Sequence, residues 1–177
     1  MSMRHWLRLA FTLKGMAGSH TRKLIPEGSR APGFRLARLD GGESALGELI
    51  AGGPLLLAFF KVSCPVCQMT LPYLERLAVP GGLRIYAVSQ NDAEDTRSFN
   101  RHFGIRLPML LDSEEEDFPA SNAFGISSVP TLFWIEADGT VGRVIEGWQK
   151  KQIEWLAEKA GVTPFRAGEK IPDWKAG

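Results

Sequence analysis

Two cysteines, Cys64 and Cys67, are the only thiols in this chain of 177 residues, and they lie three positions apart. A chain of this length buries its own core without needing a disulfide to hold it together. Closing a ring of about four residues would also stabilise the fold by only roughly 2 kcal/mol. The pair therefore indicates chemistry: two thiols at this spacing can exchange electrons with a disulfide through a mixed-disulfide intermediate.

The residues on either side predict that the pair lies where a strand passes into a helix. Leu55–Phe60 is apolar throughout, as expected of a strand buried in a parallel sheet. Pro65 suits the first position of a helix, and Pro72 is expected to kink that helix. Unpaired N–H groups at a helix N-terminus favour negative charge. We therefore expect Cys64 to be the attacking thiol and Cys67, one turn later, to be the resolving thiol.

Strands alternate with helices along the rest of the chain, and a hairpin with an Asp138-Gly139 turn precedes the last helix. This order predicts an α/β fold with a mixed sheet and helices on both faces. The cysteines would then lie at the carboxyl end of a central strand, where such sheets place their sites. The expected strands are 34–39, 55–60, 83–88, 109–111, 131–135 and 141–145, and the expected helices are 46–50, the segment from 65, 92–103 and 150–160.

Three motifs resemble the thioredoxin superfamily, and within it the TlpA-like thiol-disulfide oxidoreductases. They are residues 28–34 (Gly-Ser-Arg-Ala-Pro-Gly-Phe), residues 59–67 with the cysteine pair, and residues 129–131 (Val-Pro-Thr). The resemblance covers residues 28–161. It implies a thioredoxin-like three-layer α/β/α sandwich with a central mixed β-sheet. It also implies that Pro130 is cis and faces the cysteines, and that Val129 offers backbone hydrogen bonds to a substrate peptide.

A dithiol of this kind exchanges electrons directly, so we expect no organic cofactor and no metal. The expected partners are protein or small-molecule disulfides and dithiols, together with an upstream thiol reductant. Three positions depart from the family pattern: Ala58 replaces a buried Asp of thioredoxins, Thr70 replaces a Glu common in TlpA-like proteins, and Ser63 replaces a Trp. The usual proton acceptors for the resolving thiol are therefore absent. Lys61 could stabilise a thiolate by its charge, or could simply be a solvated residue at a strand end.

Two other hypotheses about the function remain open. In a peroxiredoxin, Cys67 would be the peroxidatic thiol, and Cys64 would take the place of the Thr in the Thr-x-x-Cys motif of that family. Peroxiredoxins use an arginine on the hairpin strand. In this chain the position expected for that arginine holds Gly142, and Arg143 comes one residue later. The second alternative is a non-catalytic binding module on a thioredoxin scaffold, against which the intact cysteine pair argues.

The composition and the two terminal segments indicate which partners and which cellular location to expect. A formal net charge of +1 indicates no nucleic-acid partner, and no apolar stretch approaches the roughly 20 residues of a membrane span. Residues 1–27 form an N-terminal extension, in which 1–17 could be an amphipathic helix that contacts a membrane surface or, as we rather expect, a docking helix or arm. Without a convincing signal peptide we expect a cytoplasmic location, with a periplasmic or membrane-associated one as the alternatives. Residues 162–177 are expected to be a tail without periodicity.

Overall fold

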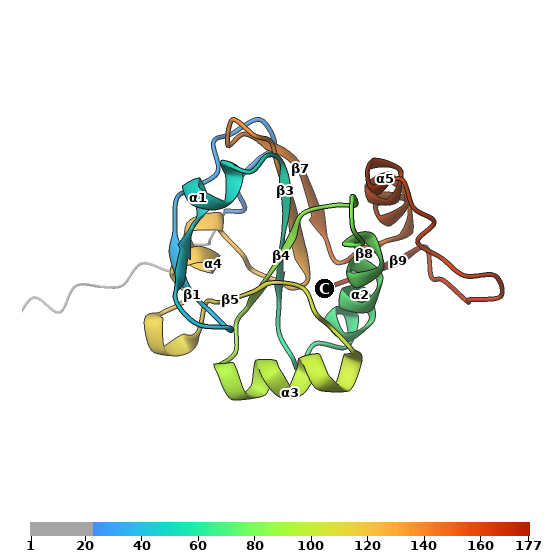
Figure 1. Ribbon diagram of the computed structural model, residues 1–177, viewed down its shortest axis with the longest axis horizontal. Helices are drawn as coiled ribbons and strands as arrows, with labels where there is room; N and C mark the ends of the chain where they lie inside the picture. The colour runs from blue at the N-terminus through green and yellow to red at the C-terminus, as the bar shows by residue number, and fades with distance from the viewer. Residues whose placement is uncertain (1–22) are drawn as a thin grey trace, which may run out of the picture.

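The computed structural model of the protein describes residues 23–177, so the predicted amphipathic helix lies outside the described residues. A central sheet stands between two groups of helices (Figure 1). No helix within the described range is long and apolar enough to cross a membrane.

Seven strands form the central sheet. They are β1 (Arg35–Arg38), β2 (Glu43–Ala45), β3 (Leu55–Phe60), β4 (Ile85–Ser89), β5 (Met109–Leu111), β6 (Thr131–Ile135) and β7 (Val141–Glu146). Their order across the sheet is β2-β1-β5-β4-β3-β6-β7. Strands β3, β4 and β5 run parallel, whereas β1 is antiparallel to β5 and β6 is antiparallel to both β3 and β7. The sheet is therefore mixed, as the sequence predicts.

Helices cover both faces of the sheet. The α-helices are α1 (Leu46–Ile50), α2 (Pro65–Leu77), α3 (Ala93–Phe103), α4 (Pro119–Phe124) and α5 (Lys150–Ala160), and a short 3₁₀ turn, η1, spans Glu114–Glu116. In Figure 1, α1 and α4 lie on one side of the sheet and α2 and α5 on the other. The molecule thus has three layers, helix, sheet and helix, in the arrangement expected of a thioredoxin-like fold.

Strand β3 divides the apolar core in two because its side chains point alternately to opposite faces. Leu56, Ala58 and Phe60 pack with α2 and α5, while alternate residues pack with α1 and α4. Every residue of β3 is completely buried. Since the central strand is fixed from both faces, its carboxyl end is a rigid platform for the cysteine loop that follows.

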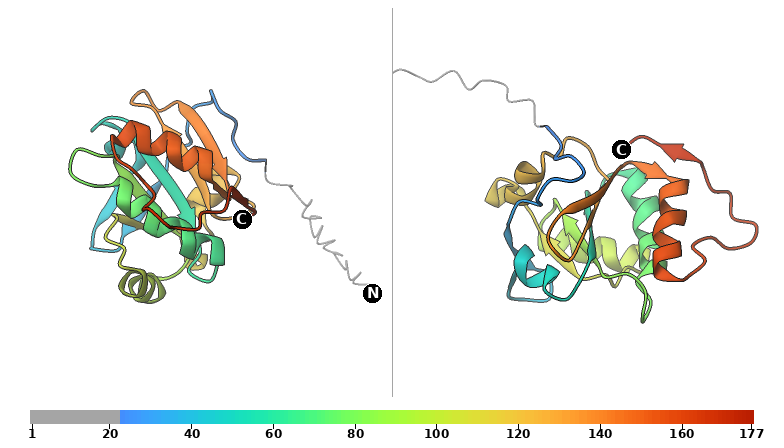
Figure 2. Two further views of the ribbon diagram at one scale, coloured as in Figure 1. Left: turned by 90° about the vertical axis from the view of Figure 1, so that its right-hand side faces the viewer. Right: turned by 90° about the horizontal axis from the view of Figure 1, so that it is seen from above.

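The C-terminal residues 162–177 pack against the domain, which the sequence pattern did not predict. Two short strands, β8 (Trp148–Gln149) and β9 (Trp174–Lys175), pair antiparallel, and the indole N–H of Trp148 donates to the Pro172 carbonyl at 2.7 Å. Figure 2 shows the segment passing beside α2 and α5 before it returns toward the sheet. Regular pairing is thus present in what looked like a tail.

An ion pair fixes the middle of this segment. Arg76 of α2 donates to both carboxylate oxygens of Glu169, at 2.7 and 2.9 Å, and its guanidinium lies over the Tyr73 ring. The bonds from Arg76 and from the Arg166 N–H lower the pKa of Glu169 to about 2. The carboxylate therefore keeps its charge, and the bridge its strength, until the pH falls from about 4.5 toward 2.

Candidate active site

The two cysteines occupy the first turn of α2. Cys64 is the N-cap of the helix, and its sulfur accepts a hydrogen bond from the Cys67 N–H at 3.2 Å. Cys64 is partly exposed, whereas Cys67 is completely buried, and both are free thiols. An outside disulfide can therefore reach Cys64 and cannot reach Cys67 without rearrangement.

Hydrogen bonds hold the loop between β3 and α2 in place. The Val62 N–H donates to the Asn91 side chain at 3.0 Å, and the Val62 carbonyl accepts from the Gln68 side chain at 2.9 Å. The Cys64 N–H closes a turn onto the Lys61 carbonyl at 3.2 Å. These contacts tie the loop both to the helix it enters and to the segment after β4.

Val129 and Pro130 lie directly against the cysteine pair. Strands β3 and β6 are antiparallel neighbours with Phe59 opposite Thr131, so the residues just before β6 meet those just after β3. The thiol of Cys64 donates to the Val129 carbonyl at 3.3 Å, across 65 positions of sequence, and the Val129–Pro130 peptide bond is cis. No hydrogen bond among the described residues uses the Val129 N–H. This group is therefore free to meet a backbone acceptor from outside.

The buried thiol stands in an apolar setting without an acid. Burial, and the neighbouring Cys64, raise the pKa of Cys67 well above the ordinary value of a thiol. Ala58 on β3 offers no proton acceptor, and the Thr70 hydroxyl donates to the Val66 carbonyl at 2.7 Å. No carboxylate among the described residues contributes to the pKa shift of Cys67. Neither Ala58 nor Thr70, at the two positions where the family carries an acidic residue, can therefore accept the proton of Cys67.

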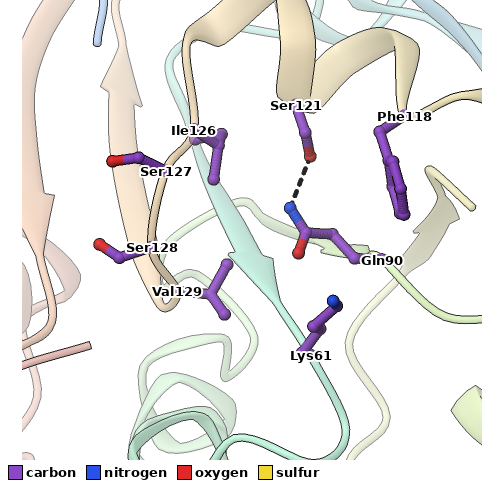
Figure 3. Close-up of a pocket in the computed structure, with 8 residues that line it drawn as sticks. All are labelled: Lys61, Gln90, Phe118, Ser121, Ile126, Ser127, Ser128 and Val129. Atoms are coloured by element: carbon purple, nitrogen blue, oxygen red, sulfur yellow. Dashed lines mark hydrogen bonds between the residues drawn. The ribbon is translucent and has the colours of Figure 1, made fainter. Parts of the chain in front are cut away.

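A pocket of about 250 Å³ lies beside Val129, and neither cysteine lines it (Figure 3). Ile126 and Val129 turn apolar side chains toward it, and Lys61 and Gln90 reach into it from the ends of β3 and β4. The amide of Gln90 donates to the Ser121 hydroxyl at 2.8 Å. The lining residues are Lys61, Gln90, Phe118, Ser121, Ile126, Ser127, Ser128 and Val129.

Sequence reasoning singled out Cys64, Cys67, Val129, Pro130 and Lys61, and the structure brings all five to one edge of the sheet. The sequence did not point to Gln90 or Ser121, because neither residue belongs to a motif. The position of Gln90 just after β4 was a usable signal, since the carboxyl ends of parallel strands meet at the site edge.

Arg143, the arginine considered for a peroxidase, lies elsewhere. Its guanidinium stacks on the Trp155 ring at 3.9 Å and donates to the Gln152 side chain at 3.1 Å, both residues of α5. These contacts hold the side chain of Arg143, a residue of β7, against α5, and neither cysteine is among its hydrogen-bond partners.

The C-terminal segment reaches the same edge. Gly147 has φ of +66°, and a side chain there would collide with the Lys175 carbonyl, so glycine allows the segment to approach closely. A Cβ built on Gly177 would lie 2.7 Å from the Val129 carbonyl oxygen. Gly177 thus lies against the backbone carbonyl that the Cys64 thiol contacts.

Comparisons with known proteins agree with this geometry. Residues 28–144 match the AhpC/TSA family. The thiol-disulfide oxidoreductase ResA of Geobacillus thermodenitrificans is 30% identical over 132 residues, which cover 72% of this chain and 74% of the relative. ResA of Halalkalibacterium halodurans is 29% identical and covers 85% of this chain and 90% of the relative.

Solved structures share the fold. A putative thiol:disulfide interchange protein DsbE from Chlorobium tepidum has a TM-score of 0.64 at 21% identity, covering 76% of this chain and 95% of that one. The thioredoxin domain of a thiol-disulfide oxidoreductase from Bacteroides vulgatus has a TM-score of 0.66 at 20% identity, covering 76% of this chain and 97% of that one. The chain belongs to the AhpC/TSA family, and within the thioredoxin superfamily it is a TlpA-like thiol-disulfide oxidoreductase.

Proposed function

We propose that Cys64 attacks a disulfide of the substrate and that Cys67 resolves the resulting mixed disulfide. The observation that carries this assignment is the difference in solvent exposure between the two cysteines. Cys64 is partly exposed at the start of α2, and Cys67 is completely buried behind it, with its N–H bonded to the Cys64 sulfur.

Each step balances in atoms and electrons. The Cys64 thiolate forms a bond to one substrate sulfur, the substrate S–S bond breaks, and the departing thiolate takes up a proton. Cys67 then loses its proton, bonds to the Cys64 sulfur and displaces the second substrate thiolate. Two electrons pass from the dithiol to the substrate, and an upstream thiol reductant returns them. Read in reverse, the same steps oxidise a dithiol.

Val129 and Pro130 form the proposed docking edge for the substrate backbone. The Val129 carbonyl points at Cys64, and its N–H has no partner among the described residues. An extended peptide paired with these two groups would lie alongside the Cys64 sulfur, as a strand lies along a sheet edge, and it would displace Gly177 from the Val129 carbonyl. Partners of this kind are polypeptides with an accessible disulfide.

Replacement of Cys67 by Ser is expected to trap the mixed disulfide. Without a resolving thiol, Cys64 stays bound to half of the substrate, and the adduct should accumulate to near one per chain. Intact-mass measurement after incubation with a peptide disulfide would show it, and a thiol reductant should remove it. A mass unchanged from that of the free variant would contradict the assignment of Cys64.

The resolving step is expected to accelerate with pH. Because burial raises the pKa of Cys67 above that of an ordinary thiol, its thiolate fraction grows about tenfold per pH unit over roughly pH 6 to 9. Release of the second product should follow the same slope, measured by stopped flow in single-turnover reactions of the reduced protein. A rate that levels off below about pH 8 would instead indicate a proton acceptor that lowers the pKa of Cys67.

A further inference from the structure

The pocket beside Val129 is placed to hold the part of a substrate that flanks its disulfide. It shares Val129 with the proposed docking edge, and Lys61 lies three residues before Cys64. In an extended peptide, neighbouring side chains point to opposite sides. A residue next to the reacting cysteine of such a peptide would therefore turn away from Cys64, and the pocket beside Val129 is lined by neither cysteine.

The charge in the pocket is one-sided. Lys61 is exposed and takes part in no ion pair and no side-chain hydrogen bond within residues 23–177. None of the eight lining residues is acidic. The nearest acidic stretch of sequence, 114–117, is exposed and lies outside the lining. The buried Asp112 carboxylate behind Ser121 is already bonded by the Ala120 and Ser121 N–H groups. The Lys61 ammonium group therefore faces a lining without an acidic side chain, which favours an anionic ligand.

The other walls set the size and character of that ligand. Gln90 is held by its bond to Ser121, so its side-chain amide has a fixed direction (Figure 3). The apolar side chains of Ile126 and Val129 face the same space. A volume of about 250 Å³ has room for a side chain with a short apolar stem and a polar end. A glutamate side chain has this form: methylenes for the apolar wall and a carboxylate for Lys61.

We propose that this pocket selects disulfide substrates that carry a carboxylate next to the reacting cysteine, with Lys61 as the group that recognises it. The proposal rests on the proposed function, because it assigns specificity to the same site. It assigns Lys61 to the substrate rather than to the Cys64 thiolate. These two roles of Lys61 predict different results, which one experiment separates.

The experiment uses three peptide disulfides that differ only in the residue after cysteine: glutamate, glutamine or lysine. Reduced full-length protein would be mixed with each, and the second-order rate constant of reduction measured at low ionic strength. For the wild type we expect the glutamate peptide to react about five- to tenfold faster than the glutamine peptide, as one partly exposed charge-assisted contact provides. The lysine peptide should be slower still, and added salt should reduce the differences.

Lys61→Met is expected to bring the rates on the glutamate and glutamine peptides within about twofold of each other. Lys61→Glu should reverse the order, so that the lysine peptide reacts fastest. Lys151→Met, at an exposed position of α5 that does not line the pocket, is the matched control and should keep the wild-type order. Comparing each variant with wild type on the same peptide cancels differences in the leaving thiols.

An equal loss on all three peptides in Lys61→Met would overturn the proposal, because it would mean that Lys61 acts on Cys64. Equal wild-type rates on the three peptides would also overturn it, while leaving the dithiol mechanism intact. If the wild type reduces none of the peptides, the proposed function fails first, so the two failures are distinguishable.

Discussion

Replacing Cys64 with serine is expected to lower the rate of disulfide reduction by about three orders of magnitude or more, as removal of a catalytic nucleophile typically does. A serine hydroxyl does not ionise near neutral pH, so it cannot open the substrate disulfide. Cys67 cannot replace it, because it is completely buried and its pKa is raised. Reduction of a peptide disulfide by the pre-reduced protein, followed by thiol release, is the measurement.

The variant should fold normally, because serine is a preferred N-cap residue and position 64 caps α2. Its circular dichroism and melting temperature are the control. Wild-type reductase activity in Cys64→Ser would refute the assignment. Rapid consumption of hydrogen peroxide that depends on Cys67 and persists in Cys64→Ser would point to the peroxidase chemistry considered from the sequence.

The largest effect on stability is expected at Trp148. Its side chain is completely buried, packs against the rings of Tyr73 and Phe165, and donates its N–H to the Pro172 carbonyl. Trp148→Ala should lower the free energy of unfolding by about 3–5 kcal/mol, the usual result of emptying a large aromatic site. Chemical denaturation followed by circular dichroism would measure it.

Trp174→Ala is the matched control, since this tryptophan on β9 is 63% exposed. It should change the free energy of unfolding by no more than about 0.5 kcal/mol. Because Trp148 joins α2 to the C-terminal segment, its loss should also speed amide exchange across 164–177. A Trp148→Ala protein within about 1 kcal/mol of wild type would show that these contacts carry little of the stability.

The central elements could be predicted because their sequences are locally consistent. Leu55–Phe60 is apolar at every position, as a strand with two buried faces must be, and Gly104 and Gly161 end the helices they follow in left-handed conformations. The cysteine spacing, together with Pro65, placed the pair at a helix start for the same reason. These signals lie within a few residues of the elements they specify.

The parts that were not predicted depend on contacts between distant residues. β2, α4, β8 and β9 are short, with two to six residues each, too few for a period to emerge. β9 exists because Trp174 meets Gln149, and Glu169 is held because Arg76 lies across from it. The pocket is likewise assembled from the ends of β3 and β4 and from the segment around α4. No local sequence pattern predicts such contacts between residues that are far apart in the chain.

The position of Gly177 against Val129 has a practical consequence for anyone who labels this protein. A fluorophore, cross-linker or affinity tag joined after residue 177 would emerge beside the backbone carbonyl that Cys64 contacts. Such a group would report on substrate arrival, and a bulky one would obstruct it. Lys23, whose carbonyl packs against Gly125 at the end of α4, offers an attachment region on the opposite helical layer. A label joined after residue 177 should therefore change the kinetics more than one attached at Lys23.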